Sequence, residues 1–504
     1  MIHLIRCAAV SAALFLCGAA ASAQDVELTS RDGTLSLSGD LQSYDGEFYR
    51  VMTEYGLLTL DGQGVVCAGP ACPDLTAHVA EVHVAGDPGA GTRLMPALVA
   101  AFAATKGYGA QWQSQGDGWI YTLTDASGAR AVARFSFVPM AADAAAAALR
   151  DGVADFVLAA LPEPGMGARV LGVEALVVVV APGNPLAAIS TGDLARVLSG
   201  QVENWNALGG PDMPLVVHAL APEAGFRRAL EARLGQKLVS DQDHATLDDL
   251  AAAVARDPWG LAVTAASATG PAQRITLTDS CGFALVPSRL SVKAGDYPLT
   301  QPFNLLTPKR RQSLMARDFL DFVGTPAAQA AVSQGGMVDR AAERGPLLTD
   351  GLRLANAIRS AGPEVPVTEL QRLTGAMAGA DRLSLTFRFQ GGARVLDASS
   401  QDNVAELARL IGAGLFDGEE LVFAGFSDGS GDAATNLALS RQRADTVREA
   451  VAAAVPDLDA RRFSLSVEAF GEVLPMACDE SPVGRQLNRR VELWLRPQST
   501  APAP

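Results

Sequence analysis

The sequence predicts a multidomain α/β protein with a small N-terminal β module, a long central α/β region and a C-terminal α/β sandwich. Three observations support this. The 504 residues exceed one ordinary core and suggest about three domains. The composition, 49% hydrophobic and 19% charged, is typical of folded domains. The spacing of apolar residues changes from strand-like alternation to strand, glycine-bearing loop and helix after about residue 79.

The first residues are typical of a cleaved export signal. A short basic start and an apolar segment precede Ala21-Ser22-Ala23, a small-x-small pattern before Gln24. The apolar span is shorter than the roughly 20 residues that a membrane-spanning helix needs. We therefore expect residues 1–23 to be removed and the protein to be exported to the periplasm.

The charge of the chain excludes one class of partner. Its 40 basic and 55 acidic residues give a formal net charge of −15, without a long run of Lys or Arg. A surface that follows nucleic-acid phosphates needs clustered positive charge. We expect no nucleic-acid partner.

Residues 24–78 predict the β module, because alternating segments such as TLSLSG and GLLTLDG are separated by Asp-Gly turns. Cys67 and Cys72 flank AGPA, a turn that can bring the two thiols together, so we predict a disulfide here. For Cys281 and Cys478 the sequence slightly favours two buried thiols over a bridge between domains.

Residues 79–345 contain an ordered set of segments: EVHVAGDPGAGTRLM, VLGVEALVVVVAPGNPL, LSGQVENWNALGG and DYPLTQPF. Together they resemble the substrate-binding proteins of phosphate ABC importers. The resemblance implies the type II periplasmic-binding-protein fold, in which two α/β lobes close on a small anion. It also implies an ABC importer as a partner.

The residues that the resemblance assigns to the anion site are altered. Ala224, Gly225, Phe226 and Arg227 stand where that family has Ser-Gly-Thr-Arg, so two hydroxyl donors are absent while the arginine remains. Each undersatisfied oxygen weakens phosphate binding by about 1–3 kcal/mol. We therefore predict weak phosphate binding, or binding of an organic anion beside Phe226.

Three further positions bear on the prediction of weak phosphate binding. Ala159 and Ala160 replace an expected serine, while the first loop retains Thr92. The predicted anion-binding residues are Thr92, Gly225 and Arg227, and a structural ion pair is an equal alternative for Arg227.

Residues 346–382 form a connector with two expected helices, and residues 383–497 form the last domain, followed by a tail at 498–504. The stretch GFSDGSG in that domain contains G-x-S-x-G, but no histidine follows Ser427, so a hydrolase triad is not indicated. A calcium loop is excluded because Ala433 and Leu439 occupy its diagnostic glycine and glutamate positions.

The same stretch, followed by TNLALSRQRADTV and GRQLNRRVELWL, resembles the OmpA-like peptidoglycan-binding domain. The resemblance places Asp428 and Arg443, fifteen residues apart, on the two positions that hold diaminopimelate. Asp428 can accept from its ammonium group and Arg443 can bind its carboxylate. Asn488 is expected to approach the ligand.

These predictions combine into an exported, noncatalytic protein without cofactor or metal. It is expected to attach to peptidoglycan near the outer membrane and to bind a small anion such as phosphate. The alternative is a structural envelope protein whose central domain has lost its solute site.

Overall fold

The computed structural model describes residues 25–74, 78–347, 351–390, 395–455, 459 and 461–498. The predicted export signal at 1–23 and residues 499–504 of the predicted tail lie outside the described residues. The module that ends at Ala80 forms one compact unit, and the rest of the chain apart from Ser313–Met315 forms another. The predicted class, a mixed α/β protein with an N-terminal strand module, is confirmed.

The N-terminal module is an antiparallel sheet of five strands in the order β4-β3-β2-β1-β5. Its core consists of Val26, Leu28, Tyr49 and Val51, which come from alternate positions of their strands. The predicted disulfide between Cys67 and Cys72 is present. The strands are β1 (Val26–Ser30), β2 (Ser36–Tyr44), β3 (Phe48–Thr53), β4 (Gly56–Asp61) and β5 (Val65–Ala68).

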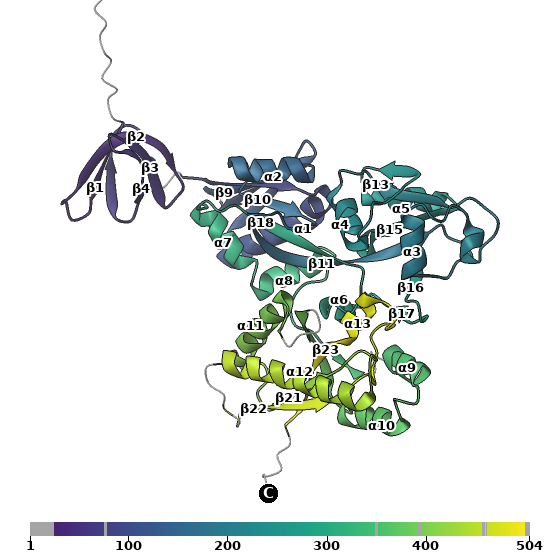
Figure 1. The fold of residues 1–504 in the computed structure, drawn as a ribbon. Helices are drawn as coiled ribbons and strands as arrows, with labels where there is room; N and C mark the ends of the chain where they lie inside the picture. The colour runs from purple at the N-terminus through teal and green to yellow at the C-terminus, as the bar shows by residue number, and fades with distance from the viewer. Residues whose placement is uncertain are drawn as a thin grey trace, which may run out of the picture. The chain divides into compact units, whose positions relative to one another are not determined.

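The central domain has two lobes joined by a continuous sheet, through β11 (Gly167–Val180) and β18 (Thr300–Thr307) (Figure 1). Residues 167–175 of β11 pair with β18, and residues 176–180 pair with β15 (Gly260–Ala265) of the second lobe. The buried second half of β11 reads LVVVV, as expected for a strand covered on both faces. One strand thus connects the cores of both lobes.

The first lobe packs helices around the strands next to β18, and its core holds the phenylalanine cluster of Phe102, Phe135 and Phe319. Its elements are β6 (Ala80–Gly86), α1 (Pro88–Lys106), β7 (Gly109–Gln115), β8 (Gly118–Thr124), β9 (Ala131–Pro139), α2 (Ala142–Asp151), β10 (Phe156–Ala159), α7 (Leu314–Phe322) and α8 (Pro326–Gln334).

The second lobe has an aliphatic core that includes Leu194, Leu250 and Val263. Its elements are β12 (Ala188–Ser190), α3 (Thr191–Leu198), η1 (Trp205–Leu208), β13 (Val216–Leu220), α4 (Gly225–Leu234), β14 (Gln242–His244), α5 (Leu247–Arg256), β15 (Gly260–Ala265), η2 (Ala266–Ala268), β16 (Gln273–Thr278), β17 (Ala284–Leu285) and α6 (Arg289–Lys293).

The C-terminal domain has a sheet in the order β19-β20-β23-β21-β22. Leu421 and Phe423 face a core with α11 and α12, whereas Val422 and Trp494 face the opposite core with α9 and α10. Its elements are β19 (Arg344–Pro346), α9 (Gly351–Ser360), α10 (Val367–Ala376), β20 (Asp381–Arg388), α11 (Ala398–Gly412), β21 (Glu419–Gly425), α12 (Ala433–Ala454), β22 (Phe463–Ala469), α13 (Pro482–Asn488) and β23 (Arg490–Pro497).

Residues 346–382, predicted as a connector, pack onto the C-terminal domain and do not form a separate linker. It forms the two expected helices, but Ala357, Leu373 and Met377 are buried against the second face of the C-terminal sheet. Pro346 belongs to β19, which pairs with β20. The helices therefore complete this domain, because a central strand needs cover on both faces.

The central and C-terminal domains are joined covalently and by buried charges. Cys281, after β16, forms a disulfide with Cys478, so the slightly favoured prediction of two free thiols is wrong. Asp296 of the central domain accepts hydrogen bonds from Arg382 and Arg388 of β20, at 2.6 and 2.8 Å. These contacts hold the second lobe to β20 and to the Cys478 loop of the C-terminal domain.

Glu492 lies at the centre of this charged cluster and is fully buried. Its carboxylate accepts from Arg490 Nε at 2.7 Å and pairs with Arg353 and Arg382. Burial alone would raise the pKa of Glu492, but the three guanidinium groups hold it well below its ordinary value of 4.5. The stability that this lowered pKa provides is present above about pH 4.5 and is lost as the pH falls below it.

Glu492→Gln is expected to lower the free energy of unfolding by about 3–5 kcal/mol at neutral pH, because it leaves buried guanidinium groups without their counter-charge. Glu420→Gln is the matched control. It removes an ion pair with Arg496 at a partly exposed position of the same sheet and should cost about 1 kcal/mol or less. Guanidinium denaturation measures both, and equal effects would contradict a dominant role of burial.

Candidate functional site

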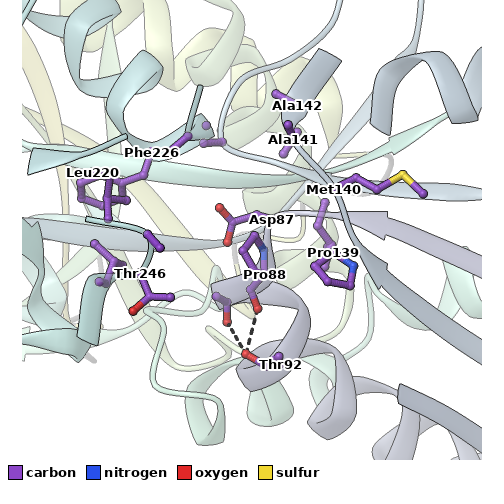
Figure 2. A pocket seen from close by; sticks show the side chains of 18 of the residues that line it. Asp87, Pro88, Thr92, Pro139, Met140, Ala141, Ala142, Leu220, Phe226 and Thr246 are labelled. Atoms are coloured by element: carbon purple, nitrogen blue, oxygen red, sulfur yellow. Dashed lines mark hydrogen bonds between the residues drawn. The ribbon is translucent and has the colours of Figure 1, made fainter. Parts of the chain in front are cut away.

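A cavity of about 660 Å³ lies in the central domain and is lined from both lobes. Figure 2 shows Leu220 and Phe226 of the second lobe on one side, and Pro139 and Met140 of the first lobe on the other. Asp87 lies between these two sides. The cavity therefore occupies the position where a two-lobed domain can enclose a small molecule.

Thr92, predicted to bind an anion, lines this cavity. Its hydroxyl donates to the carbonyl oxygen of Pro88 at 2.8 Å, one turn earlier in α1, as the dashed lines of Figure 2 show. Ala159 and Ala160 also line the cavity, so the positions expected to lack a serine hydroxyl do face it. With its proton engaged within the helix, the Thr92 hydroxyl acts toward a ligand mainly as an acceptor.

The N-terminus of α4 opens into the same cavity through Gly225 and Phe226. Ala224 occupies the N-cap position and has no side-chain cap, and among the described residues the N–H groups of 225–227 have no acceptor. The first N–H groups of a helix attract negative charge. Gly225 therefore stays a predicted ligand residue through its backbone.

Arg227 does not line this cavity, although it follows Gly225 and Phe226 directly. Its guanidinium is buried in the second lobe, where it donates to Leu220 and Leu238 carbonyl oxygens and pairs with Asp243. A side chain with these partners is a structural element of the lobe. Of the two alternatives from the sequence, the geometry matches the ion pair.

Arg227→Ala is expected to lower the free energy of unfolding by about 3 kcal/mol, because it leaves buried carbonyl oxygens unsatisfied. Arg228→Ala is the matched control. That neighbouring side chain pairs with Asp143, which is 89% exposed, and its loss should cost about 1 kcal/mol or less. Thermal unfolding checks both, and a silent Arg227→Ala would contradict the structural role.

The cavity contains acidic side chains that the sequence prediction missed. Glu174 of β11 is 3% exposed and accepts from Ser267 N–H and from its hydroxyl at 2.7 Å. Asp87 caps α1 by accepting from Ala90 N–H at 2.9 Å. Arg93 donates to the Ser267 hydroxyl and to the Gly89 carbonyl oxygen.

Burial raises the pKa of both Glu174 and Asp87, against the opposing effects of their hydrogen bonds and of Arg93. For Glu174 a signal was available, because a single acid interrupts the apolar run VLGVEALVVVV. The Asp-Pro pair that begins α1 is typical of a helix start and gave no functional signal.

The second candidate site is in the C-terminal domain, at the loop between β21 and α12. Asp428 is 7% exposed, and its carboxylate accepts from Ser430 N–H at 3.1 Å and from Arg489 Nη1 at 2.9 Å. Two bonds leave part of its acceptor capacity open, since an ionised carboxylate offers about four lone-pair sites. Arg489 is thus an ion-pair partner of Asp428.

Arg443 of α12 is 6% exposed, and its Nη1 is buried without a hydrogen-bond partner among the described residues. Its guanidinium lies over the Phe389 ring at 5.8 Å. Burial lowers the pKa of Arg443, and the charge of Arg489 lowers it further, while Asp428 acts in the opposite direction. A buried cation beside a second cation is a suitable receptor for a carboxylate.

The side-chain amide of Asn488, which is predicted to approach the ligand, is hydrogen-bonded within the domain. Its Oδ1 accepts from Met476 and Ala477 N–H, and its Nδ2 donates to the Ala477 carbonyl oxygen and to Asp479. These four bonds use the whole capacity of the amide. Asn488 therefore positions the 476–479 loop beside the site.

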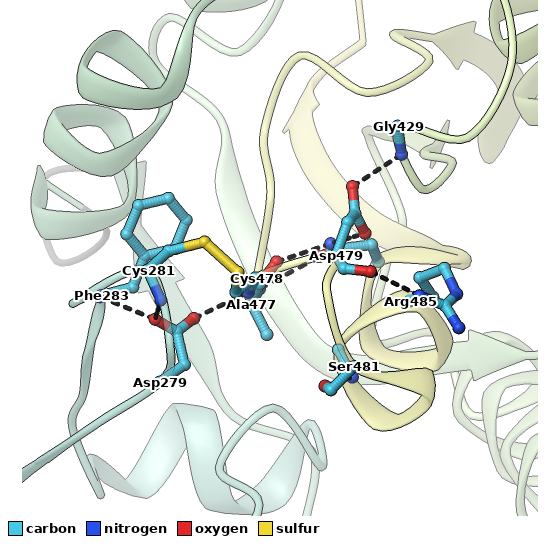
Figure 3. Close-up of a disulfide and its surroundings, with 11 residues drawn as sticks. Asp279, Cys281, Phe283, Gly429, Ala477, Cys478, Asp479, Ser481 and Arg485 are labelled. Atoms are coloured by element: carbon cyan, nitrogen blue, oxygen red, sulfur yellow. Dashed lines mark hydrogen bonds between the residues drawn. A yellow bond between two sulfur atoms is a disulfide. The ribbon is translucent and has the colours of Figure 1, made fainter. Parts of the chain in front are cut away.

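Two further acids belong to this site and were missed. Asp479 accepts from Gly429 N–H at 2.7 Å, as Figure 3 shows, next to the Cys478 disulfide. Glu472 accepts from Asn436 at 2.6 Å, and burial raises its pKa, helped by the charges of Asp479 and Asp428. Both acids lie far from GFSDGSG in the sequence, so the motif did not indicate that they would contact this loop.

Two parts of the chain match known protein families. Residues 109–326 match the PBP superfamily domain and residues 388–489 match the OmpA family, so the chain carries both domains in this order. Both are families of binding proteins, not of enzymes. No helix among the described residues is long and apolar enough to cross a membrane.

Known proteins match part of the chain. Protein SphX of Synechococcus elongatus is 30% identical over 164 residues, which are 30% of this chain and 49% of that protein. The chain thus spans about half the length of this curated relative. Two solved structures are similar to about half of the chain. One is an ABC-type phosphate transport receptor from Vibrio cholerae, with a TM-score of 0.40, and the other is a putative phosphate ABC transporter substrate-binding protein with bound phosphate from Clostridium perfringens, with a TM-score of 0.41. Each is 16% identical and covers 51% of this chain and 99% of its own.

Proposed function

We propose that this protein acts in the periplasm, where its OmpA domain holds it on peptidoglycan and its two-lobed domain binds a small solute. The observation that carries the proposal is the buried Nη1 of Arg443, which has no hydrogen-bond partner among the described residues and lies in the electrostatic environment of Asp428 and Arg489. Arg489 is already paired with Asp428, whereas the Nη1 of Arg443 has no hydrogen-bond partner among the described residues, so a ligand carboxylate can serve as its acceptor and counter-charge. The acids Asp428 and Glu472 supply acceptors for an ammonium group.

Diaminopimelate in the wall peptide carries both groups at its free end. Co-sedimentation of the full chain with diaminopimelate-type peptidoglycan tests the proposal. Free diaminopimelate should compete, whereas cadaverine, which has two amines and no carboxylate, should not. Equal sedimentation with lysine-type peptidoglycan, which lacks the second carboxylate at this position, would contradict the proposed site.

The solute-binding part of the proposal rests on the 660 Å³ cavity. Phosphate stays a prediction with weak expected affinity, since Arg227 is engaged elsewhere and alanines replace the hydroxyl donors. An ABC importer likewise stays a predicted partner. The alternative is a structural envelope protein whose central domain has lost its solute site. The disulfide and the ion cluster that fix the second lobe favour this alternative. It requires that no solute changes the thermal unfolding of the protein.

A further inference from the structure

The lining of the central cavity has a charge opposite to that expected for an anion receptor. Besides Asp87 and Glu174, three exposed acids line it: Asp117, Glu223 and Asp248. Arg93 is the one basic side chain among the lining residues that the structure describes. Negatively charged side chains repel an anion, most strongly where they are buried as Glu174 is, so this lining opposes a simple anion such as phosphate.

Three charged side chains of the cavity lining lie close to one another, the carboxylates of Asp87 and Glu174 and the guanidinium of Arg93, and together they carry one excess negative charge. Glu174 and Arg93 both contact the Ser267 hydroxyl, and the charge of Arg93 acts on Asp87 as well as on Glu174. Two carboxylates and one guanidinium therefore share this wall. Because burial disfavours an uncompensated carboxylate, a ligand that brings one positive charge stabilises the wall.

The cavity also has a positive end and an apolar surface. The N-terminus of α4 has no side-chain cap, and its first N–H groups, beside Gly225, have no acceptor in the described part of the chain, so they favour a carboxylate. Leu158, Leu220, Phe226 and Phe303 add apolar surface to the lining. A ligand with one charge of each sign and a hydrocarbon part complements all three features.

We propose that the cavity binds a small zwitterionic amino compound of the amino-acid class, with its ammonium group at Asp87 and Glu174 and its carboxylate at the N-terminus of α4. This inference rests on the proposed solute-binding function and names the chemical class of its ligand. It departs from the phosphate suggested by the resemblance, and it assigns ligand contacts to two acids that the sequence prediction missed.

Calorimetric titration of the full chain with a matched set of probes tests the class. Phenylalanine carries both charges, phenylalaninamide lacks the carboxylate, 3-phenylpropanoate lacks the ammonium group, and inorganic phosphate lacks both the ammonium group and the apolar part. Phenylalanine should bind at least about tenfold more tightly than 3-phenylpropanoate, since a charged hydrogen bond is lost. Leucine and 4-methylpentanoate repeat the comparison with a smaller side chain.

Variants then test the two acids. Asp87→Asn keeps a capping side chain for α1, and Glu174→Gln keeps partners for Ser267, so both should fold as the wild type does. Each should weaken phenylalanine binding at least about tenfold. The control Asp151→Asn removes one exposed charge at the end of α2, outside the cavity, and should change affinity less than twofold. Thermal unfolding confirms that the variants are folded.

The outcomes separate this inference from the proposed function. If phosphate or 3-phenylpropanoate binds as tightly as phenylalanine, or if Asp87→Asn and Glu174→Gln leave phenylalanine binding unchanged, the zwitterion inference is wrong while solute binding stands. If no probe binds and a broad pool of metabolites leaves thermal unfolding unchanged, solute binding by the central domain fails as well. Peptidoglycan sedimentation reports independently on the OmpA domain.

Discussion

Removal of the Cys281–Cys478 disulfide is expected to lower the free energy of unfolding by about 5 kcal/mol. The bond joins residues 197 apart in sequence, and in the chain-entropy description a loop of that length gives about this constraint on the unfolded chain. The double variant Cys281→Ser/Cys478→Ser avoids unpaired thiols. Guanidinium denaturation under oxidising conditions measures the change against the wild type.

The Cys67–Cys72 disulfide provides the control within the same chain. Its partners are only 5 residues apart in sequence, so the same description gives about 2 kcal/mol, confined to the N-terminal module. A Cys67→Ser/Cys72→Ser variant should leave unfolding of the two larger domains unchanged. If the Cys281–Cys478 variant unfolds like the wild type, the bond does not constrain these domains.

The same disulfide has a second measurable consequence at the wall-binding site. Cys478 is adjacent to Asp479, whose carboxylate accepts from Gly429 N–H in the loop that carries Asp428. Cys478 N–H also donates to Asp279 of the central domain at 2.7 Å. Loss of the bond should therefore weaken peptidoglycan sedimentation severalfold, because the loop loses its covalent support, and this readout is separate from global stability.

Much of the fold was predictable because it depends on local patterns. Alternating apolar residues indicated the β module, and ordered segments indicated the two-lobed domain and the C-terminal domain. The role of 346–382 was not predictable in full. Its helices were expected, but burial of Leu373 and Met377 against β21 and β23 depends on a pairing of distant elements that their own sequence does not specify.

A site residue could be predicted from the sequence where its role depends only on the motif that contains it. The charge of Asp428 acts on Arg443, and the ligand role of both residues stays a prediction. Arg227 and Asn488 were assigned by their places in a motif, but their partners come from other segments: Asp243 for Arg227 and Asp479 for Asn488. Tertiary neighbours that consume hydrogen-bonding capacity cannot be recognised from the motif alone.

Substitution of either charge at the wall-binding site is expected to reduce peptidoglycan sedimentation to background. Asp428→Ala and Arg443→Ala each remove a charged partner of one zwitterion, which corresponds to about a tenfold to hundredfold loss of affinity. The double variant should be little worse than either single one, because the groups act on the same ligand. Arg441→Ala, an exposed position on the same helix, is the matched control and should sediment like the wild type.

Arg443→Met distinguishes a ligand role of this arginine from a structural one. Its buried Nη1 has no partner among the described residues, and Arg489 repels its charge. Replacement by an apolar side chain of similar length therefore breaks no hydrogen bond at that atom. The melting temperature should therefore stay the same or rise while wall binding is lost, as expected when a site is kept unfavourable for stability in order to bind. A variant that unfolds several degrees earlier than the wild type and still sediments with peptidoglycan would show that Arg443 supports the domain and not the ligand.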